Sequence, residues 1–175
     1  SAPLKNGVDY LWWENLDQDI TASQIHMPIV FQHIATQVVV DLSAGEGLQL
    51  DSLVSATILP PTPGASLDIE TGIIEATDTY DTPLNMGKNG FLAQAIVLPT
   101  RATTPMSMTL KILADGETTP RTYTGSIPIP GKLAGGFSYV FSAIIDGNSV
   151  SFPNVSIKDW TEVDESGNPI YPIQK

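Results

Sequence analysis

The stretch FQHIATQVVVDL, Phe31–Leu42, carries the clearest strand pattern in the chain. Successive side chains of a strand point to opposite faces of its sheet. One face would therefore hold the more apolar set, Ile34, Thr36, Val38, Val40 and Leu42, and the other Ala35, Gln37, Val39 and Asp41. The glycine-containing segment that follows, 44–47, is expected to end the strand.

Two further stretches, 106–112 and 137–145, alternate in the same way. Turn sequences follow both of them, at 115–117 and 146–149, and predict hairpins. Weaker patterns predict strands over 53–59, 67–74 and 91–98. The proline-rich segment 60–64 is expected to be a stiff loop, and the polar, poorly patterned region 77–90 a longer one.

About ten short strands separated by turns are typical of an all-β, antiparallel sandwich, with a closed barrel as the alternative. No segment keeps a helical period for three turns. The residues expected to build the core are Phe31, Val38, Val40, Leu110, Ile112, Phe137, Tyr139, Phe141 and Trp160.

The composition excludes several classes of function. Charged residues make up 15% of the 175, and the formal net charge is −11. Such a surface repels phosphate backbones and anionic lipid, so we expect no nucleic-acid partner. The chain has no cysteine, which removes disulfides, thiolate metal sites and cysteine nucleophiles. No apolar run approaches the roughly 18 residues of a membrane span, so this domain is not expected to insert into a membrane.

The two histidines, His26 and His33, do not predict a metal site. Pro28 prevents a continuous helix from presenting both, and no recognisable ligand spacing surrounds them. We therefore expect His33 to be a packed residue that makes one or two hydrogen bonds. The acidic cluster Glu14, Asp17 and Asp19 lacks the pattern of a calcium loop.

Motifs for catalysis are missing as well. The chain has neither a G-x-S-x-G elbow nor a phosphate-binding glycine loop. No pair of carboxylates is singled out for acid–base chemistry. We therefore predict that the protein is not an enzyme and has no cofactor.

The adjacent residues Trp12 and Trp13 support an alternative function. Neighbours in a strand point to opposite faces, so one indole would be buried and the other could be exposed. An exposed indole can stack on a sugar ring. The alternative is therefore a glycan-binding surface module.

Several segments, in their order along residues 8–160, resemble the fimbrillin-like (Mfa-like) family of Bacteroidales surface proteins. Val8–Trp13 resembles its D-L-L-W/Y strand and Phe31–Val38 its F-x-H-x-[LM]-[AS]-[KQ] strand. The remaining matches are IVLP ending at Pro99, L-x-G-x-x-Y with Gly135 and Tyr139, and I-x-D-W with Asp159 and Trp160.

The resemblance implies a transthyretin-like, antiparallel Greek-key β-sandwich used as a subunit of type V fimbriae or a related adhesin. It also implies a lipoprotein precursor, an outer-membrane or fimbrial location, and strand addition between subunits. Partners would be other fimbrial subunits or ligands on host or bacterial surfaces. The prolines in the segment PIYPI (169–173) make it a poor strand to add to another subunit's sheet. The sequence is therefore as compatible with a tip, anchor or stand-alone adhesin as with a stalk pilin.

The resemblance also predicts the domain organisation. Residues 1–24 would be a leading strand and a connection from an N-terminal domain upstream. Residues 25–165 would form the β-sandwich, and residues 166–175 a polar tail.

Overall fold

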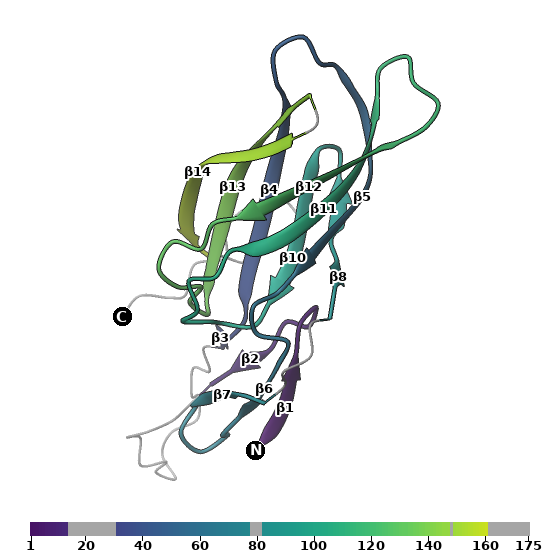
Figure 1. The fold of residues 1–175 in the computed structure, drawn as a ribbon. Helices are drawn as coiled ribbons and strands as arrows, with labels where there is room; N and C mark the ends of the chain where they lie inside the picture. Colours follow the sequence, from purple (N-terminus) through teal and green to yellow (C-terminus); the bar gives the residue numbers. More distant parts are fainter. Residues whose placement is uncertain (14–30, 78–81, 148, 161–175) are drawn as a thin grey trace, which may run out of the picture.

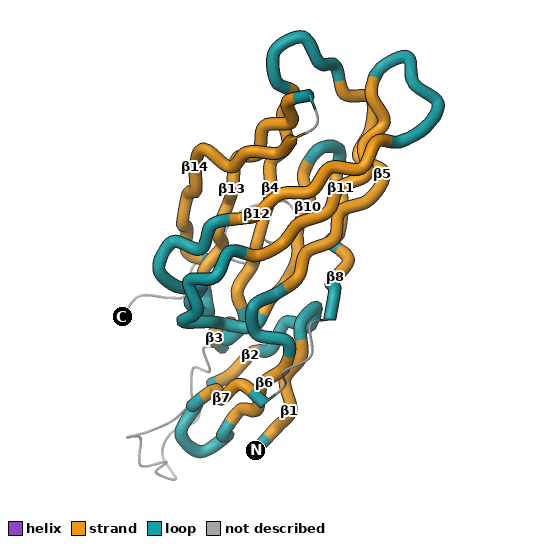
Figure 2. Tube along the Cα trace, viewed as in Figure 1, coloured by secondary structure: helices purple, strands orange, loops and turns teal. Residues whose placement is uncertain are grey.

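The computed structural model describes residues 1–13, 31–77, 82–147 and 149–160, and these residues form fourteen strands and no helix. Most of the strands lie in two sheets that pack face to face (Figures 1 and 2). A smaller group of strands lies at the lower end of these sheets in the same view. The all-β sandwich expected from the sequence is therefore confirmed.

The first sheet has the strand order β14-β13-β4-β10-β9. Its strands are β4 (Thr36–Ala44), β9 (Gly87–Asn89), β10 (Leu92–Val97), β13 (Phe137–Asp146) and β14 (Ser149–Asp159). Neighbours are antiparallel except β13 and β4, which run parallel with Tyr139 opposite Val38. The edge strands of this sheet are β14 and β9.

The second sheet has the order β12-β11-β5-β8, and all of its pairs are antiparallel. Its strands are β5 (Leu50–Leu59), β8 (Leu84–Asn85), β11 (Met106–Ala114) and β12 (Arg121–Ile127). The main core lies between the two sheets. Its fully buried side chains include Val38, Val40, Ile58, Leu110, Ile112, Tyr123, Phe141 and Ile145.

The smaller group, which we call the basal unit, consists of five short strands. They are β1 (Ala2–Lys5), β2 (Leu11–Trp12), β3 (Gln32–His33), β6 (Gly64–Leu67) and β7 (Ile74–Ala76). Its strands pair in the orders β1-β6-β7 and β2-β3. A second apolar cluster of Leu4, Ala65, Leu67 and Leu98 holds the unit together.

Asn6 and Gly7 connect the basal unit to the sandwich. The Asn6 side chain donates to the carbonyl oxygen of Thr62 (2.8 Å), and its Oδ1 accepts from the amide of Leu98 (2.8 Å). The amide of Gly7 donates to the carbonyl oxygen of Ile96 in β10 (2.8 Å). The bonds to Ile96 and Leu98 satisfy backbone groups at the end of β10.

The strongest sequence patterns are confirmed by burial. In β4, Thr36, Val38, Val40 and Leu42 are buried. Met106, Met108, Leu110 and Ile112 of β11 are buried on one face, and their neighbours Ser107, Thr109 and Lys111 are exposed. Tyr139, Phe141, Ala143 and Ile145 of β13 are also buried. Strands that carry one face against a core show this alternation most clearly.

Three of the predicted core residues do not lie in the main core. Phe31 precedes the two-residue strand β3 in the basal unit and is exposed. Phe137 is the first residue of β13, opposite the exposed Asp159, and 37% of it is exposed. Trp160 is half-buried and packs outside the sandwich, against His33.

Three segment predictions were wrong. The expected strand over 67–74 is interrupted by a tight loop, Asp68–Ile73, between β6 and β7. The region 77–90 contains β8 and β9, which are too short to show an alternating pattern. The strand expected over Phe31–Leu42 is broken after His33, so that β3 pairs with β2 in the basal unit and β4 begins only at Thr36. The remaining expected strands and hairpins are present.

Candidate functional site

His33 is a packing residue with partners from both ends of the chain. Its ring stacks on the indole of Trp160, with centroids 4.1 Å apart and planes 12° from parallel. Its Nδ1–H donates to Oδ1 of Asp9 (3.0 Å), since a carboxylate can only accept. The imidazole therefore links the segment before β2 to the residue that follows β14.

The turn before β13 lies directly beside this stack. The amide of Gly136 donates to the carbonyl oxygen of Ala35 (2.9 Å), and its carbonyl accepts from the amide of Trp160 (2.9 Å). A Cβ at Gly135 would lie 2.4 Å from the carbonyl oxygen of Ile34. The turn therefore needs glycine at position 135 because two backbone segments touch there.

The remaining signature residues gather at the same end of the sandwich. The hydroxyl of Tyr139 accepts from the amide of Ala134 (2.9 Å). Pro99 precedes Thr100, which exchanges two backbone hydrogen bonds with Leu133 (2.9 Å each). Asp159 pairs with Phe137 at the end of the β13–β14 hairpin. Segments far apart in the sequence thus meet where the basal unit joins the sandwich.

Strand β14 changes character at a bulge. Phe152 and Pro153 together stand opposite the single residue Ala143, because the register with β13 shifts there. A bulge tolerates proline, which cannot donate a ladder hydrogen bond. Val150 and Phe152 pack on the main core. From Pro153 to Asp159, every residue is exposed.

The exposed half of β14 includes side chains on the core face of its sheet. Directly opposite residues of an antiparallel pair share a face, and Val155 and Ile157 lie opposite the buried Phe141 and Tyr139. Yet Val155 is 38% exposed and Ile157 50% exposed. With Phe137 they form a strip of three apolar side chains, which we call the open strip. No described strand pairs with the outer edge of β14.

The open strip was not predicted from the sequence. The alternation of Val155 and Ile157 marks a strand face but does not show whether another strand covers it. The signal that could have indicated a change is Pro153, because a proline within a strand points to an edge or a bulge.

The two tryptophans proposed for glycan contact are both half-buried. Trp12 belongs to the apolar cluster of the basal unit, and a Cβ at Gly72 would lie 2.6 Å from its ring. One part of this indole is therefore packed under the loop between β6 and β7. The expectation that one tryptophan would be buried and the other exposed is not met.

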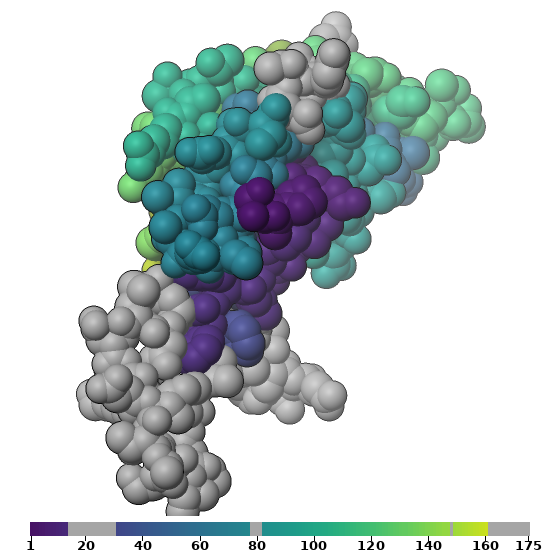
Figure 3. Space-filling model, turned by 90° about the horizontal axis from the view of Figure 1, so that it is seen from below, coloured from purple at the N-terminus to yellow at the C-terminus, as the bar shows by residue number. Residues whose placement is uncertain are grey.

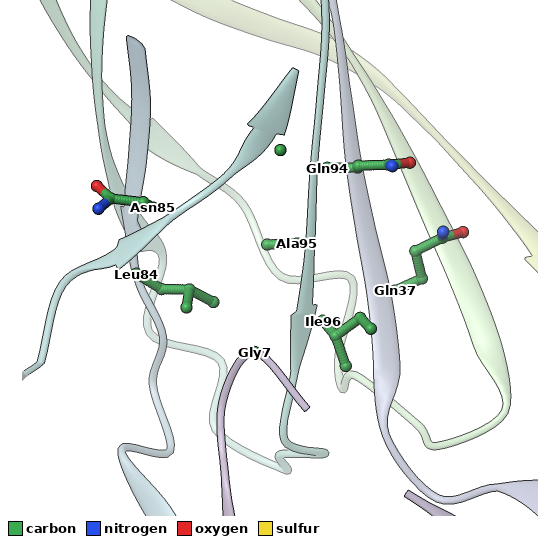
Figure 4. A pocket seen from close by; sticks show the side chains of 8 residues that line it. Gly7, Gln37, Leu84, Asn85, Gln94, Ala95 and Ile96 are labelled. Atoms are coloured by element: carbon green, nitrogen blue, oxygen red, sulfur yellow. The ribbon is translucent and has the colours of Figure 1, made fainter. Parts of the chain in front are cut away.

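A depression of about 250 Å³ lies beside β10, and its lining includes Gly7, Leu84 and Ile96 (Figure 4). Its polar side chains do not converge. Figure 4 shows the amides of Gln37 and Gln94 on one side and that of Asn85 pointing away from them. Gln37 accepts from the Ser138 hydroxyl (2.7 Å), so the hollow does not offer a converging set of ligand-binding groups.

Groups for metal binding or membrane crossing are not found in the described part of the chain. No group of three or more His, Asp or Glu residues among the described positions could hold a metal ion. The same residues form no helix that is long and apolar enough to cross a membrane. The acidic cluster at positions 14, 17 and 19 lies outside the described residues.

Comparison with known proteins identifies relatives of the chain. The family model described as fimbrillin-like matches residues 2–160. None of the curated proteins compared with the chain matches it.

Solved structures share the fold at low sequence identity. A proposed cell adhesion protein from Bacteroides uniformis ATCC 8492 is similar with a TM-score of 0.62 and 20% identity, over 76% of this chain and 53% of its own. A second, from Bacteroides ovatus ATCC 8483, has a TM-score of 0.58 and 19% identity, over 78% and 49%.

The tip fimbrial protein Mfa3 from Porphyromonas gingivalis, with a C-terminal truncation, has a TM-score of 0.50 and 11% identity, over 74% and 52%. The matched part of each of these three structures is about half of its length.

Proposed function

Because the chain belongs to the fimbrillin-like family, we propose that it is a structural and adhesive subunit at the bacterial cell surface. It would belong to a type V fimbria or a related adhesin and assemble by strand addition. The observation that carries this proposal is the outer half of β14, where no strand of the described residues pairs with the outer edge and the open strip lies beside it.

An added strand would find both kinds of interaction that strand addition uses. The outer edge of β14, with which none of the described strands pairs, offers backbone donors and acceptors. Each hydrogen bond formed there contributes about 0.5–1.5 kcal/mol net. Alternate side chains of the added strand would cover the exposed parts of Phe137, Val155 and Ile157. Covering each would contribute about 1 kcal/mol to the free energy of association.

The position of the open strip supports the same role. Strand β12 contacts β14 through Gly125, which lies beside Val150 and Phe152. The open strip lies farther along β14 than this contact. The His33–Trp160 stack and the Trp160–Gly136 bond hold the last described residue of this hairpin in place. The receiving edge is therefore fixed before any partner binds, which lowers the entropic cost of association.

A pair of variants tests the proposal in the native bacterium. Val155→Asp with Ile157→Asp places two charges on the open strip, where an added strand would have to bury them. Val54→Asp is the matched control, because Val54 is 40% exposed on β5 in the other sheet. The double variant should fold and reach the surface but not join polymers, and the control should polymerise normally.

The measurement is the size distribution of surface protein after shearing, together with circular dichroism of each purified variant. Polymer formation by the double variant at the level of the control would contradict strand addition at this edge. Loss of folding would show instead that the open strip is already buried by the chain itself, which also contradicts the proposal.

The glycan-binding alternative stays a prediction. Trp13, half-buried beside β2, is the better candidate of the two because the Trp12 ring is packed against Gly72. An array of immobilised glycans separates the two functions. Binding that is lost on Trp13→Ala while folding and polymer formation are unchanged would support the alternative.

A further inference from the structure

The side of the sandwich away from β14 also ends in open strand edges. The first sheet ends there in β9, and the second ends in β8, which pairs with β5 only at Thr57 and Ile58. None of the described strands pairs with the outer edge of β9, or with residues 50–55 of β5 on this side. The basal unit lies at the lower end, where Figure 3 shows the N-terminal residues beside the segment that contains β6. Open edges of this kind can pair with strands of other chains.

Lys88 starts on the core face of this edge. It lies in the middle of β9 and is paired with Ala93 of β10, and directly opposite residues of an antiparallel pair share a face. Ala93 is fully buried in the main core. The Lys88 side chain therefore leaves β9 toward the second sheet, although the residue is exposed because β9 is the edge strand.

The Lys88 ammonium group reaches across to β5. Its Nζ donates to the carbonyl oxygen of Leu53 (3.1 Å) and to that of Val54. Consecutive carbonyls of a regular strand point in opposite directions, but the register of β5 with β11 shifts between Lys111 and Ile112, and Val54 is the extra residue. A bulge leaves its extra residue outside the ladder. One ammonium group can therefore bind both carbonyls.

These contacts make pairing at this side unfavourable. A charged side chain that points inward is one of the ways in which natural sheets protect an edge. A strand added to β9 would have to bury the ammonium group or separate it from two carbonyl oxygens, and both changes cost free energy. The opposite edge of the same sheet is different, because β14 carries Val155 and Ile157 on its core face.

We propose that Lys88 protects this side of the sandwich from strand pairing with a second copy of the chain. The protection does not depend on strand addition at β14, because it concerns the other edge of the sheet. With strand addition at β14, Lys88 would leave β14 as the receiving edge of this sheet, and the polymers would be unbranched. This consequence alone rests on the proposed function.

A pair of methionine variants tests the role of the ammonium group. Lys88→Met removes the charge and keeps an unbranched side chain. Lys111→Met is the matched control, because Lys111 is exposed on β11, which has a strand on each side. Each variant removes one positive charge from a net charge of −11. Sedimentation of the purified proteins over a range of concentrations measures their self-association.

The association constant of Lys88→Met should exceed that of Lys111→Met by about tenfold or more, as for relief of an unfavourable buried charge. Lys88→Arg keeps the charge and the N–H donors, so it should associate no more than the unchanged chain. A photoreactive label locates the contact. Attached at Asn89→Cys, on the exposed end of β9, it should cross-link copies of Lys88→Met, and a label at Ser156→Cys should not gain cross-links from the same substitution.

Equal association constants for Lys88→Met and Lys111→Met would overturn the proposal. Association that the label places away from β9 would overturn it too. So would a marked fall in the melting temperature of Lys88→Met but not of Lys111→Met, because the lysine would then hold the two sheets together instead of protecting their edge.

Discussion

Substitution of Gly135 by alanine tests whether the signature segments form one rigid junction. The added Cβ would lie 2.4 Å from the carbonyl oxygen and 2.9 Å from the carbonyl carbon of Ile34. Both are backbone atoms, and the adjoining Ala35 carbonyl already accepts from Gly136. The methyl group can therefore be accommodated only by moving β13 away from the segment that leads into β4.

The expected cost follows from these contacts. Overpacking a close contact costs about 1–3 kcal/mol, and loss of the Gly136–Ala35 hydrogen bond adds about 1 kcal/mol. We therefore expect Gly135→Ala to lower the free energy of unfolding by about 3 kcal/mol. Urea unfolding measures it, and with a slope of about 1–3 kcal/mol/M the midpoint should fall by about 1 M or more.

Gly87→Ala is the matched control for this experiment. Gly87 begins β9, and the nearest atoms to its added Cβ would be 3.7 Å away, an ordinary contact. The control should change the free energy of unfolding by no more than about 0.5 kcal/mol. Equal midpoints for the two variants would refute the inference that backbone contact at Gly135 holds the junction together.

Three further predictions concern other parts of the chain. A double-mutant cycle with His33→Ala and Trp160→Ala should give a coupling of about 1 kcal/mol, and additive effects would show that the stack contributes nothing. The pKa of Asp68 is lowered, first by the hydrogen bond from the amide of Glu70 and then by that from the amide of Thr71. The contribution of Asp68 to the free energy of unfolding is therefore fully present above its unfolded-state pKa and is lost as the pH falls through its folded-state pKa. An NMR titration of Asp68 with equal midpoints in the folded and the urea-unfolded protein would contradict this. Phe141→Ala should cost about 3–5 kcal/mol in urea unfolding and Phe137→Ala markedly less, since the first is fully buried and the second is not.

The sequence predicts the central strands well because their physical setting is simple. Val38, Leu110 and Phe141 lie on strands with one face against the core, so burial repeats every second residue. The alternating pattern fails to predict the structure where a side chain, instead of a neighbouring strand, forms hydrogen bonds with the backbone. Asp68 binds two amides of its own loop and so interrupts the strand that the apolar residues around it suggest.

The candidate site is harder to predict from the sequence, because it consists of apolar side chains that the opposite sheet does not cover. The open strip exists because the opposite sheet does not shield Val155 and Ile157, and no local pattern shows where a facing strand ends. The alternation of residues 137–145 likewise predicts a buried Phe137, because it does not show that Phe137 lies where the facing sheet gives no cover. The partners of His33 could not be named from the sequence, because Asp9 and Trp160 come from distant segments that only the fold brings together.

The most direct test of the proposed assembly is intersubunit cross-linking at β14. Ser156 is exposed on the outer half of this strand, and the chain has no cysteine of its own. Ser156→Cys can therefore carry a photoreactive label, with Thr119→Cys in the exposed β11–β12 turn as the control. Strand addition predicts that label at position 156 joins neighbouring subunits in assembled polymers and that label at 119 does not. Equal cross-linking at the two positions, or none at 156 in polymers that have formed, would contradict the account.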